Sequence, residues 1–232
     1  PQITKPFPKY NTIGKDEINS VNQILKSGEL SGFVAGNSSA FYGGKWVKNL
    51  EAEFCKVYKV KHAIAVNSAT SGLYSMVMSM NIEPGDEVIT SPYTMHATAS
   101  SILQAGGVPI FADIESDYYG LDPLSVERKI NKRTKGILAV NIFGHAAKLE
   151  VLKKIAKKYN LWLCEDNSQA PSAIYRNRFT GTYGEAAVFS FNRHKTMQSG
   201  EGGVVITNNS KIAKKIQLVR NHGEAVVSDF KV

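Results

Sequence analysis

Residues 161–170 have the sequence Leu-Trp-Leu-Cys-Glu-Asp-Asn-Ser-Gln-Ala, in which an apolar run of four residues is followed by two adjacent carboxylates. A short run that is apolar throughout is typical of a strand buried on both faces of a parallel sheet. A carboxylate such as Asp166, directly after a buried strand, is unfavourable unless it has a cationic partner or hydrogen bonds. The stretch therefore predicts either a ligand site or a structural carboxylate that caps the following loop.

The segments around this stretch alternate between strand and helix. Two amphipathic helices are expected first, from Gly14 to near Gly28 and over 45–58. Further strands are expected over 63–66, 88–90, 108–112, 136–140, 186–191 and 203–207, and further helices over 68–80, 95–104, 123–130 and 149–159. This alternation predicts an α/β fold, with a mostly parallel sheet covered by helices on both faces. Ligands of such folds bind at the carboxyl ends of the strands.

The composition is that of a globular protein. Of 232 residues 43% are hydrophobic and 21% charged, which excludes a disordered, collagenous or coiled-coil chain. The net charge of +8 suits an anionic partner, whether nucleic acid, membrane surface or phosphorylated small molecule. Lysines recur at helical spacing within 153–158 and 211–215, but no aromatic residues interleave with them. We therefore interpret them as solvated helix faces, with no nucleic-acid partner expected.

The sequence shows no clear sign of a membrane span, a signal peptide or a disulfide framework. No apolar run reaches the 18 or so residues of a membrane span, so we expect no membrane partner. The polar residues 1–10 contain no signal-peptide core, and Cys55 and Cys164 lie far apart in apolar contexts. Such cysteines are typical of reduced core residues in an intracellular protein. A cytoplasmic protein is predicted.

Three polar clusters lie at the ends of predicted strands. Residues 67–72 form a turn of small residues before a helix, which fits a phosphate cup or an ordinary cap made by Ser68 or Thr70. Asp166 belongs to the second cluster. The third places Lys195 in a loop that leads to Gly200-Glu201-Gly202-Gly203. Lysine is the usual residue for a Schiff base, although most lysines are only surface cations.

Together the clusters supply the groups that pyridoxal phosphate requires. The small-residue turn would hold the phosphate, and Asp166 would keep the pyridine nitrogen protonated. Lys195 would hold the aldehyde. Each signal is weak alone, but their order along the chain and their common place at strand ends make pyridoxal phosphate the predicted cofactor.

With these motifs the sequence resembles the DegT/DnrJ/EryC1/StrS aminotransferases, which act on nucleotide-linked keto sugars and have the fold of type I aspartate aminotransferase. The resemblance runs along essentially the whole chain. Its carriers are 67–73, 84–88, 91–94, 111–114, 165–170, 189–191, Lys195, 200–203 and Arg220-Asn221-His222-Gly223.

The resemblance implies roles for individual residues. Lys195 would be the catalytic residue, as Schiff-base lysine and general acid and base, and Asp166 would pair with the pyridine nitrogen. The other implied cofactor contacts are Gln169 at the ring or its phenolic oxygen, and Ser190, Thr70 and the backbone at Ala69 around the phosphate. Met95 stands where some family members have an aromatic residue stacked on the ring, so a thioether would pack there. His194 is close by in sequence, as a packing or a catalytic residue. No metal is expected.

The resemblance also implies a reaction. One branch of the family removes a sugar hydroxyl and has histidine where Lys195 stands, so lysine favours transfer of an amino group, commonly from glutamate, to a nucleotide-linked keto sugar. A homodimer is implied. The alternatives are a pyridoxal-phosphate dehydratase or lyase on the same fold, and a non-catalytic module that binds a phosphorylated ligand.

The domain organisation follows from the same resemblance. Residues 1–60 are expected to form an N-terminal helical segment and substrate loop, and residues 61–232 the large domain that binds pyridoxal phosphate. The family normally continues into a smaller C-terminal domain, which we expect to be missing from this chain.

Overall fold

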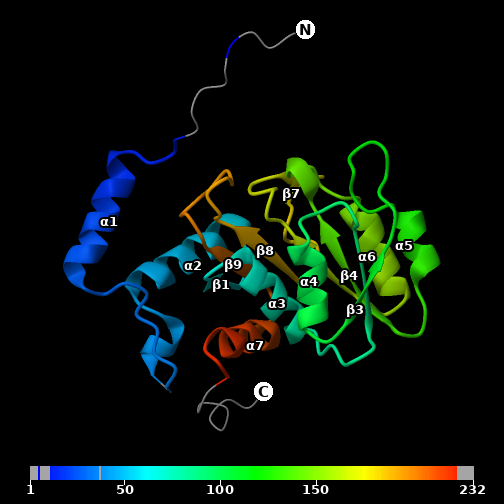
Figure 1. Ribbon diagram of the computed structural model, residues 1–232, viewed down its shortest axis with the longest axis horizontal. Helices are drawn as coiled ribbons and strands as arrows, with labels where there is room; N and C mark the ends of the chain where they lie inside the picture. Colours follow the sequence, from blue (N-terminus) through cyan, green and yellow to red (C-terminus); the bar gives the residue numbers. More distant parts are fainter. Residues whose placement is uncertain (1–4, 6–10, 37, 224–232) are drawn as a thin grey trace.

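A seven-stranded sheet forms the centre of the computed structural model, which describes residue 5 and residues 11–36 and 38–223 (Figure 1). The strand order is β1-β9-β8-β5-β4-β2-β3. The strands are β1 (His62–Val66), β2 (Glu87–Thr90), β3 (Val108–Phe111), β4 (Thr134–Val140), β5 (Trp162–Asp166), β8 (Ala186–Ser190) and β9 (Gly203–Thr207).

The sheet is mostly parallel, as predicted. Strands β3, β2, β4, β5 and β8 run in one direction, whereas β9 is antiparallel to both of its neighbours, β8 and β1. Because β9 runs backwards, its first residue, Gly203, pairs with the last residues of β1 and β8, Val66 and Ser190. The carboxyl ends of the parallel strands therefore lie at one end of the sheet, together with the start of β9.

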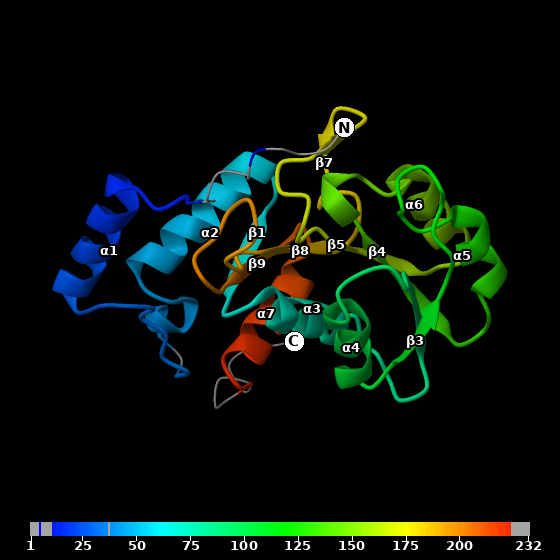
Figure 2. The same ribbon diagram turned by 45° about the horizontal axis from the view of Figure 1, so that its top comes forward.

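Helices cover both faces of the sheet, which confirms the predicted layers (Figure 2). On one face α3 (Ala69–Ser79), α4 (Ala97–Gln104) and α7 (Ser210–Arg220) pack against the sheet through residues such as Met76, Ile102 and Ile216. On the other face α5 (Pro123–Lys129) and α6 (Leu149–Lys158) form a second core around Leu152, and α2 (Lys45–Tyr58) forms a third around Phe54.

Several predicted boundaries differ from the structure by one or two residues, and two of these differences affect the site. The strand expected to end at Cys164 continues to Asp166, because Glu165 and Asp166 still pair with β4 on one side and β8 on the other. Helix α4 begins at Ala97 and not at Met95, since Met95 lies in the preceding turn and its carbonyl accepts a hydrogen bond from the Thr98 amide. The sequence signals also gave no indication of a short antiparallel hairpin, β6 (Ile174–Tyr175) and β7 (Arg178–Phe179).

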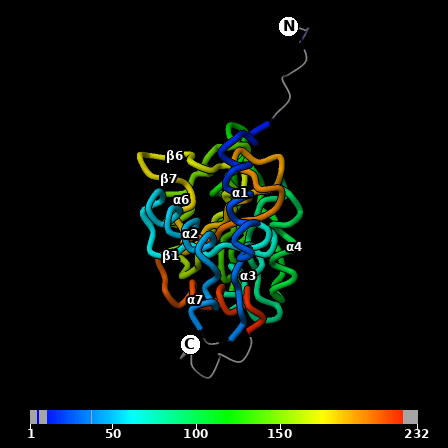
Figure 3. Tube along the Cα trace, turned by 90° about the vertical axis from the view of Figure 1, so that its left-hand side faces the viewer, coloured from blue at the N-terminus to red at the C-terminus, as the bar shows by residue number. Residues whose placement is uncertain are grey.

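The first helix, α1 (Lys15–Ser27), forms as predicted but buries no residue. Its apolar residues Ile18, Val21 and Leu25 are each more than half exposed. Viewed from the α1 side, this helix lies in front of the rest of the molecule (Figure 3). The division into 1–60 and 61–232 stays a prediction, and residues 1–4, 6–10, 37 and 224–232 of these ranges lie outside the described part of the chain.

Within the described residues, no helix combines the length and apolar character needed to cross a membrane. Both cysteines are free thiols, with Cys164 buried and Cys55 half-buried. No group of three or more His, Cys, Asp or Glu side chains in this part of the chain is placed to hold a metal ion.

Candidate functional site

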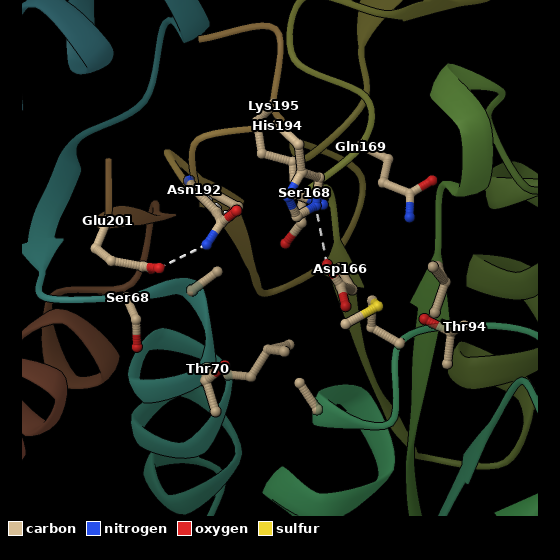
Figure 4. Close-up of a pocket in the computed structure, with 16 residues that line it drawn as sticks. Ser68, Thr70, Thr94, Asp166, Ser168, Gln169, Asn192, His194, Lys195 and Glu201 are labelled. Atoms are coloured by element: carbon tan, nitrogen blue, oxygen red, sulfur yellow. Dashed lines mark hydrogen bonds between the residues drawn. The ribbon is translucent and has the colours of Figure 1, made fainter. Parts of the chain in front are cut away.

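The predicted site residues come together in one pocket at the carboxyl ends of the parallel strands (Figure 4). All of them line it, namely Ala69, Thr70, Met95, Asp166, Gln169, Ser190 and Lys195. They reach it from the start of α3, the turn before α4, the end of β5 and the loop after it, the end of β8, and the loop between β8 and β9. Residues far apart in the sequence thus share one cavity, as expected for the ligand end of a parallel sheet.

The start of α3 forms one wall of this pocket. Ser68 is the N-cap, and its Oγ accepts a hydrogen bond from the Ser71 amide at 3.1 Å. Of the two possible caps, Ser68 is therefore the one used, and Thr70 lines the pocket. Amides in the first turn of a helix have no partner within the helix, and together with the helix dipole they favour an anion. The cap made by Ser68 is therefore confirmed, and the phosphate cup stays a prediction with which this cap is compatible.

Gly203 explains how α3 can begin so close to the sheet. A Cβ at this position would lie 2.7 Å from the Phe189 carbonyl oxygen and 2.9 Å from the Ala69 amide nitrogen. Only glycine leaves room for the backbone of α3 beside β8 and β9. Ser190, paired with Gly203 and mostly buried, is thereby placed next to the start of α3.

Asp166 lines the pocket from the end of β5 and is 5% exposed. Its Oδ1 accepts a hydrogen bond from the Ser168 amide at 3.1 Å, and its Oδ2 accepts one from Thr98 Oγ1 at 2.8 Å. The carboxylate thus caps the following loop, as one of the two interpretations predicted, and it also faces the pocket, where a ligand site stays a prediction. Hydrogen bonds to both oxygens fix its orientation.

Two threonines, Thr98 and Thr94, form a chain of hydrogen bonds that ends on this carboxylate. The sequence analysis did not predict this pair. Thr98 is fully buried, and its Oγ1 lies 3.0 Å from Oγ1 of Thr94, which lines the pocket. A hydroxyl has one hydrogen. Because Thr98 donates its hydrogen to Asp166, the Thr94 hydroxyl must donate to Thr98. The two threonines are four residues apart at the predicted start of a helix, and this spacing is the sequence signal that could have indicated their contact.

Glu165, the neighbour of Asp166, is also buried but points away from the pocket. Its Oε1 accepts hydrogen bonds from the amides of Tyr183 (2.7 Å) and Gly184 (3.0 Å). Its Oε2 accepts from the Gly181 amide (2.6 Å) and from Asn141 Nδ2 (3.1 Å). Burial raises the pKa of this carboxyl, and the four hydrogen bonds oppose the rise. Glu165 therefore anchors the turn before β8 and takes no part in the pocket.

Lys195 lies in the loop that joins β8 to β9, and this loop is held at both ends. The Lys195 amide donates to the Asn192 carbonyl at 2.8 Å, and the Phe191 amide donates to the Gly202 carbonyl at 2.9 Å. Asn192 Nδ2 also donates to Glu201 Oε1 at 2.6 Å, a contact drawn in Figure 4. Asn192 and Glu201 line the pocket and were not predicted as site residues, because their pairing depends on the fold of this loop.

Gln169 lies where the pocket continues into a second hollow. Its Oε1 accepts a hydrogen bond from the Phe143 amide at 2.9 Å. The second hollow is lined by Met95, Phe143, Ser168, Gln169, His194, Lys195 and Thr196. Lys195 and Gln169 thus border both cavities, and His194, left open by the sequence between packing and catalysis, lines both as well.

Comparison with known proteins identifies the family. Residues 11–231 match the model of the DegT/DnrJ/EryC1/StrS aminotransferase family. The chain belongs to this family. The resemblance inferred from the motifs is therefore confirmed over nearly the whole chain.

Three similar proteins show how far the similarity extends. The spore coat polysaccharide biosynthesis protein SpsC of Bacillus subtilis is 36% identical over 91% of this chain and 51% of its own length. The UDP-4-amino-4,6-dideoxy-N-acetyl-beta-L-altrosamine transaminase of Helicobacter pylori is 38% identical over 81% of this chain and 50% of its own. GDP-4-keto-6-deoxymannose-3-dehydratase, solved with a trapped PLP-glutamate geminal diamine, is 25% identical with a TM-score of 0.84, over 92% of this chain and 54% of its own.

The chain covers only part of each of these three proteins. The chain spans about half the length of each of them. The solved dehydratase shares the α/β fold of this chain with its mostly parallel sheet, which confirms the predicted fold of type I aspartate aminotransferase.

Proposed function

We propose that the chain carries the cofactor site of a pyridoxal-phosphate aminotransferase that moves an amino group from an amino acid, glutamate in the first place, to a nucleotide-linked keto sugar. The observation that carries the proposal is that a lysine, a buried carboxylate and a helix start line one pocket. Family membership and the transaminase of Helicobacter pylori support the same reaction.

The residues of the pocket fit the chemistry of this cofactor. The start of α3, with Thr70 and the Ala69 backbone, and Ser190 opposite would bind the phosphate. Asp166 is a nearly buried carboxylate whose oxygens already accept two hydrogen bonds, and a protonated pyridine nitrogen would supply the missing cation. Gln169 and Met95 would contact the ring.

Pyridoxal phosphate, when bound, supplies a carbonyl that takes up the amino group and a ring that accepts electrons. Lys195 would hold the cofactor covalently and would then move protons at the carbon next to the nitrogen, as general base and general acid. The loop that carries Lys195 is tied at both ends by backbone hydrogen bonds, which fixes the backbone of this lysine beside the pocket that it lines. Asp166, fixed by Thr98 and Ser168, would maintain the charge of the ring nitrogen.

The second candidate is a dehydratase, because a sugar dehydratase shares this fold. A lysine at position 195 favours amino transfer, since the resemblance implies histidine there in the dehydratase branch of the family. Mass spectrometry of the product distinguishes an amino sugar from a deoxy sugar. A non-catalytic binding module would not need Lys195 at the pocket.

The decisive experiment is reconstitution of the chain with pyridoxal phosphate, followed by borohydride reduction and peptide mass spectrometry. We expect a visible absorption band that shifts on addition of glutamate, and a cofactor-modified peptide containing Lys195. Both should be lost in Lys195→Ala and retained in Lys211→Ala, which removes an exposed lysine of α7. A wild-type protein that leaves the Lys195 peptide unmodified would refute the proposal.

We also propose a cytoplasmic homodimer, with the cofactor domain over 61–232 and an N-terminal segment over 1–60. The exposed apolar side chains of α1 support a second copy as the surface that covers them, because such side chains are unfavourable in water. Light scattering across a concentration series measures the oligomeric state, and a monomer at all concentrations would argue against the dimer.

A further inference from the structure

Three aromatic rings form a cluster at the carboxyl edge of the sheet. Tyr93 follows β2, Tyr119 lies in the loop after β3, and Phe143 follows β4. The ring centroids of Tyr93 lie 6.0 Å from Tyr119 and 5.8 Å from Phe143, and those of Tyr119 and Phe143 are 6.4 Å apart. The three residues are 46%, 47% and 60% exposed, respectively. A cluster so open to solvent adds little to the core.

The backbone that presents two of these rings is strained. Tyr119 has φ 60° and Phe143 has φ 54°, the left-handed conformation that large side chains rarely adopt. Such a conformation is unfavourable and persists only where the surrounding structure or a function requires it. Both side chains are exposed, so burial of the rings is not the reason for this conformation.

The cluster borders the proposed active site. Phe143 and Lys195 both line the second hollow, with Gln169 in the same wall. The Phe143 amide donates a hydrogen bond to Gln169 Oε1, so the backbone at Phe143 is tied to a residue of the proposed cofactor pocket. A ligand that starts at Lys195 and extends along this hollow reaches Phe143.

We propose that Tyr93, Tyr119 and Phe143 form a stacking platform for the base of a nucleotide-linked substrate. This inference rests on the proposed function and specifies where the nucleotide end of the substrate lies. The sugar would lie toward Lys195, and the base would stack on the rings. Aromatic side chains bind bases through their faces with little dependence on base identity, because every base has a π face.

The arrangement of the rings favours a flat ligand. Their interplanar angles are 58°, 73° and 83°, so no two of the three rings are stacked on each other. Each ring meets its neighbours edge-on or tilted, which leaves ring faces available to a base. The tyrosines at 93 and 119 also offer hydroxyl groups, suited to the polar edge of a base and its ribose.

The test is a calorimetric titration of the reconstituted protein with uridine and guanosine diphosphates. Phe143→Leu keeps the apolar volume but removes the π face, and Tyr93→Leu removes a second ring by the same change. We expect each to weaken nucleotide binding about tenfold, in the range of base stacking on one ring. Phe143→Tyr should restore binding to within about twofold, because it keeps a ring. Tyr159→Leu, which removes an exposed tyrosine at the end of α6, is the matched control and should bind as wild type.

The outcomes separate this inference from the proposed function. Absence of the Lys195-linked cofactor in the wild type counts against the proposed function. If the cofactor is linked but the wild type binds neither nucleotide, or the leucine variants bind both as tightly as wild type, the stacking platform is rejected alone. If the leucine variants instead turn a dimer into a monomer with unchanged nucleotide affinity, the rings belong to an interface between copies, and the inference is also rejected. Retention of the cofactor by each variant shows that its site is folded.

Discussion

Glu165 and Asp166 are adjacent in β5 and both are buried, yet their side chains point to opposite faces of the sheet. Glu165 accepts four hydrogen bonds from the turn before β8 and from Asn141. Asp166 accepts two, from Thr98 and Ser168, and faces the pocket. The pleat separates them, because successive side chains of a strand point to opposite faces. Burial of a carboxylate therefore does not by itself mark a functional residue, and the groups that surround it decide.

The largest effect should come from the structural carboxylate. Glu165→Gln replaces one oxygen by an NH2 group that faces amide donors, so we expect it to lower the free energy of unfolding by about 3 kcal/mol. Urea titration measures this loss. Glu185→Gln, at an exposed position of the same turn region, should change it by less than about 0.5 kcal/mol. Equal losses in the two variants would contradict the anchoring role of Glu165.

Asp166→Asn should mainly weaken cofactor binding, whereas Glu165→Gln should mainly lower stability. The amide cannot balance a protonated ring nitrogen, so the affinity for pyridoxal phosphate should fall at least about thirtyfold, in the range for truncating a buried charge pair. Stability should fall much less than in Glu165→Gln. Fluorescence titration with the cofactor gives the first quantity and urea titration gives the second. If the Asp166→Asn variant bound the cofactor as tightly as the wild type does, the contrast between the two carboxylates would be lost.

The threonine behind Asp166 should have a smaller effect. Thr98→Val keeps the shape but removes the hydroxyl, and we expect about tenfold weaker cofactor binding, as for one hydrogen bond to a charged group. Thr98→Ser should restore most of the affinity. Thr90→Val is the matched control, because Thr90 is equally buried but donates to the Leu138 carbonyl at 2.9 Å. A loss of affinity in both valine variants would indicate a general packing effect.

The smallest effect concerns pH and the opposite end of the sheet. Burial, and then the charge of Lys61, lower the pKa of His62 at the start of β1 from its ordinary value of 6.5. The unfolded chain therefore binds more protons than the folded one just below this pH, and stability falls as the pH falls through that window. His62→Gln should flatten this part of the stability profile in urea titrations and leave cofactor affinity unchanged. A change in affinity would mean that the two ends of the sheet are coupled.

The sequence alone predicted those helices and strands that depend on local patterns of residues. Apolar runs located the strands, and Asp122-Pro123 marked the start of α5, where Asp122 caps the helix as predicted. The joint order of three polar clusters pointed to Thr70, Asp166 and Lys195, which the structure brings to one pocket. The family resemblance added Ala69, Met95, Gln169 and Ser190, whereas Thr94, Asn192 and Glu201 were not predicted. Strand-end position is a local property, and parallel strands bring such positions to one edge.

What the sequence could not predict depends on register and on contacts between distant segments. The pleat that separates Glu165 from Asp166 follows from continued pairing of β5 with β4 and β8. The two-residue strands β6 and β7 are too short to show any periodicity. For α1, the apolar spacing predicts a helix but does not specify what covers its apolar side.

The pairing of β1 with β9 has a consequence for the order in which the molecule folds. The Lys61 amide donates to Asn208 Oδ1 across a sequence separation of 147 residues, and Arg220 binds Glu51 across 169. Contacts of such long range form slowly, because a long loop must close first. During synthesis the α3 helix emerges early, but Gly203 and Ser190 can border its first turn only once β9 has been made. This wall of the pocket can therefore form only after β9 has paired with β1 and β8, and a ligand that binds there would report that pairing.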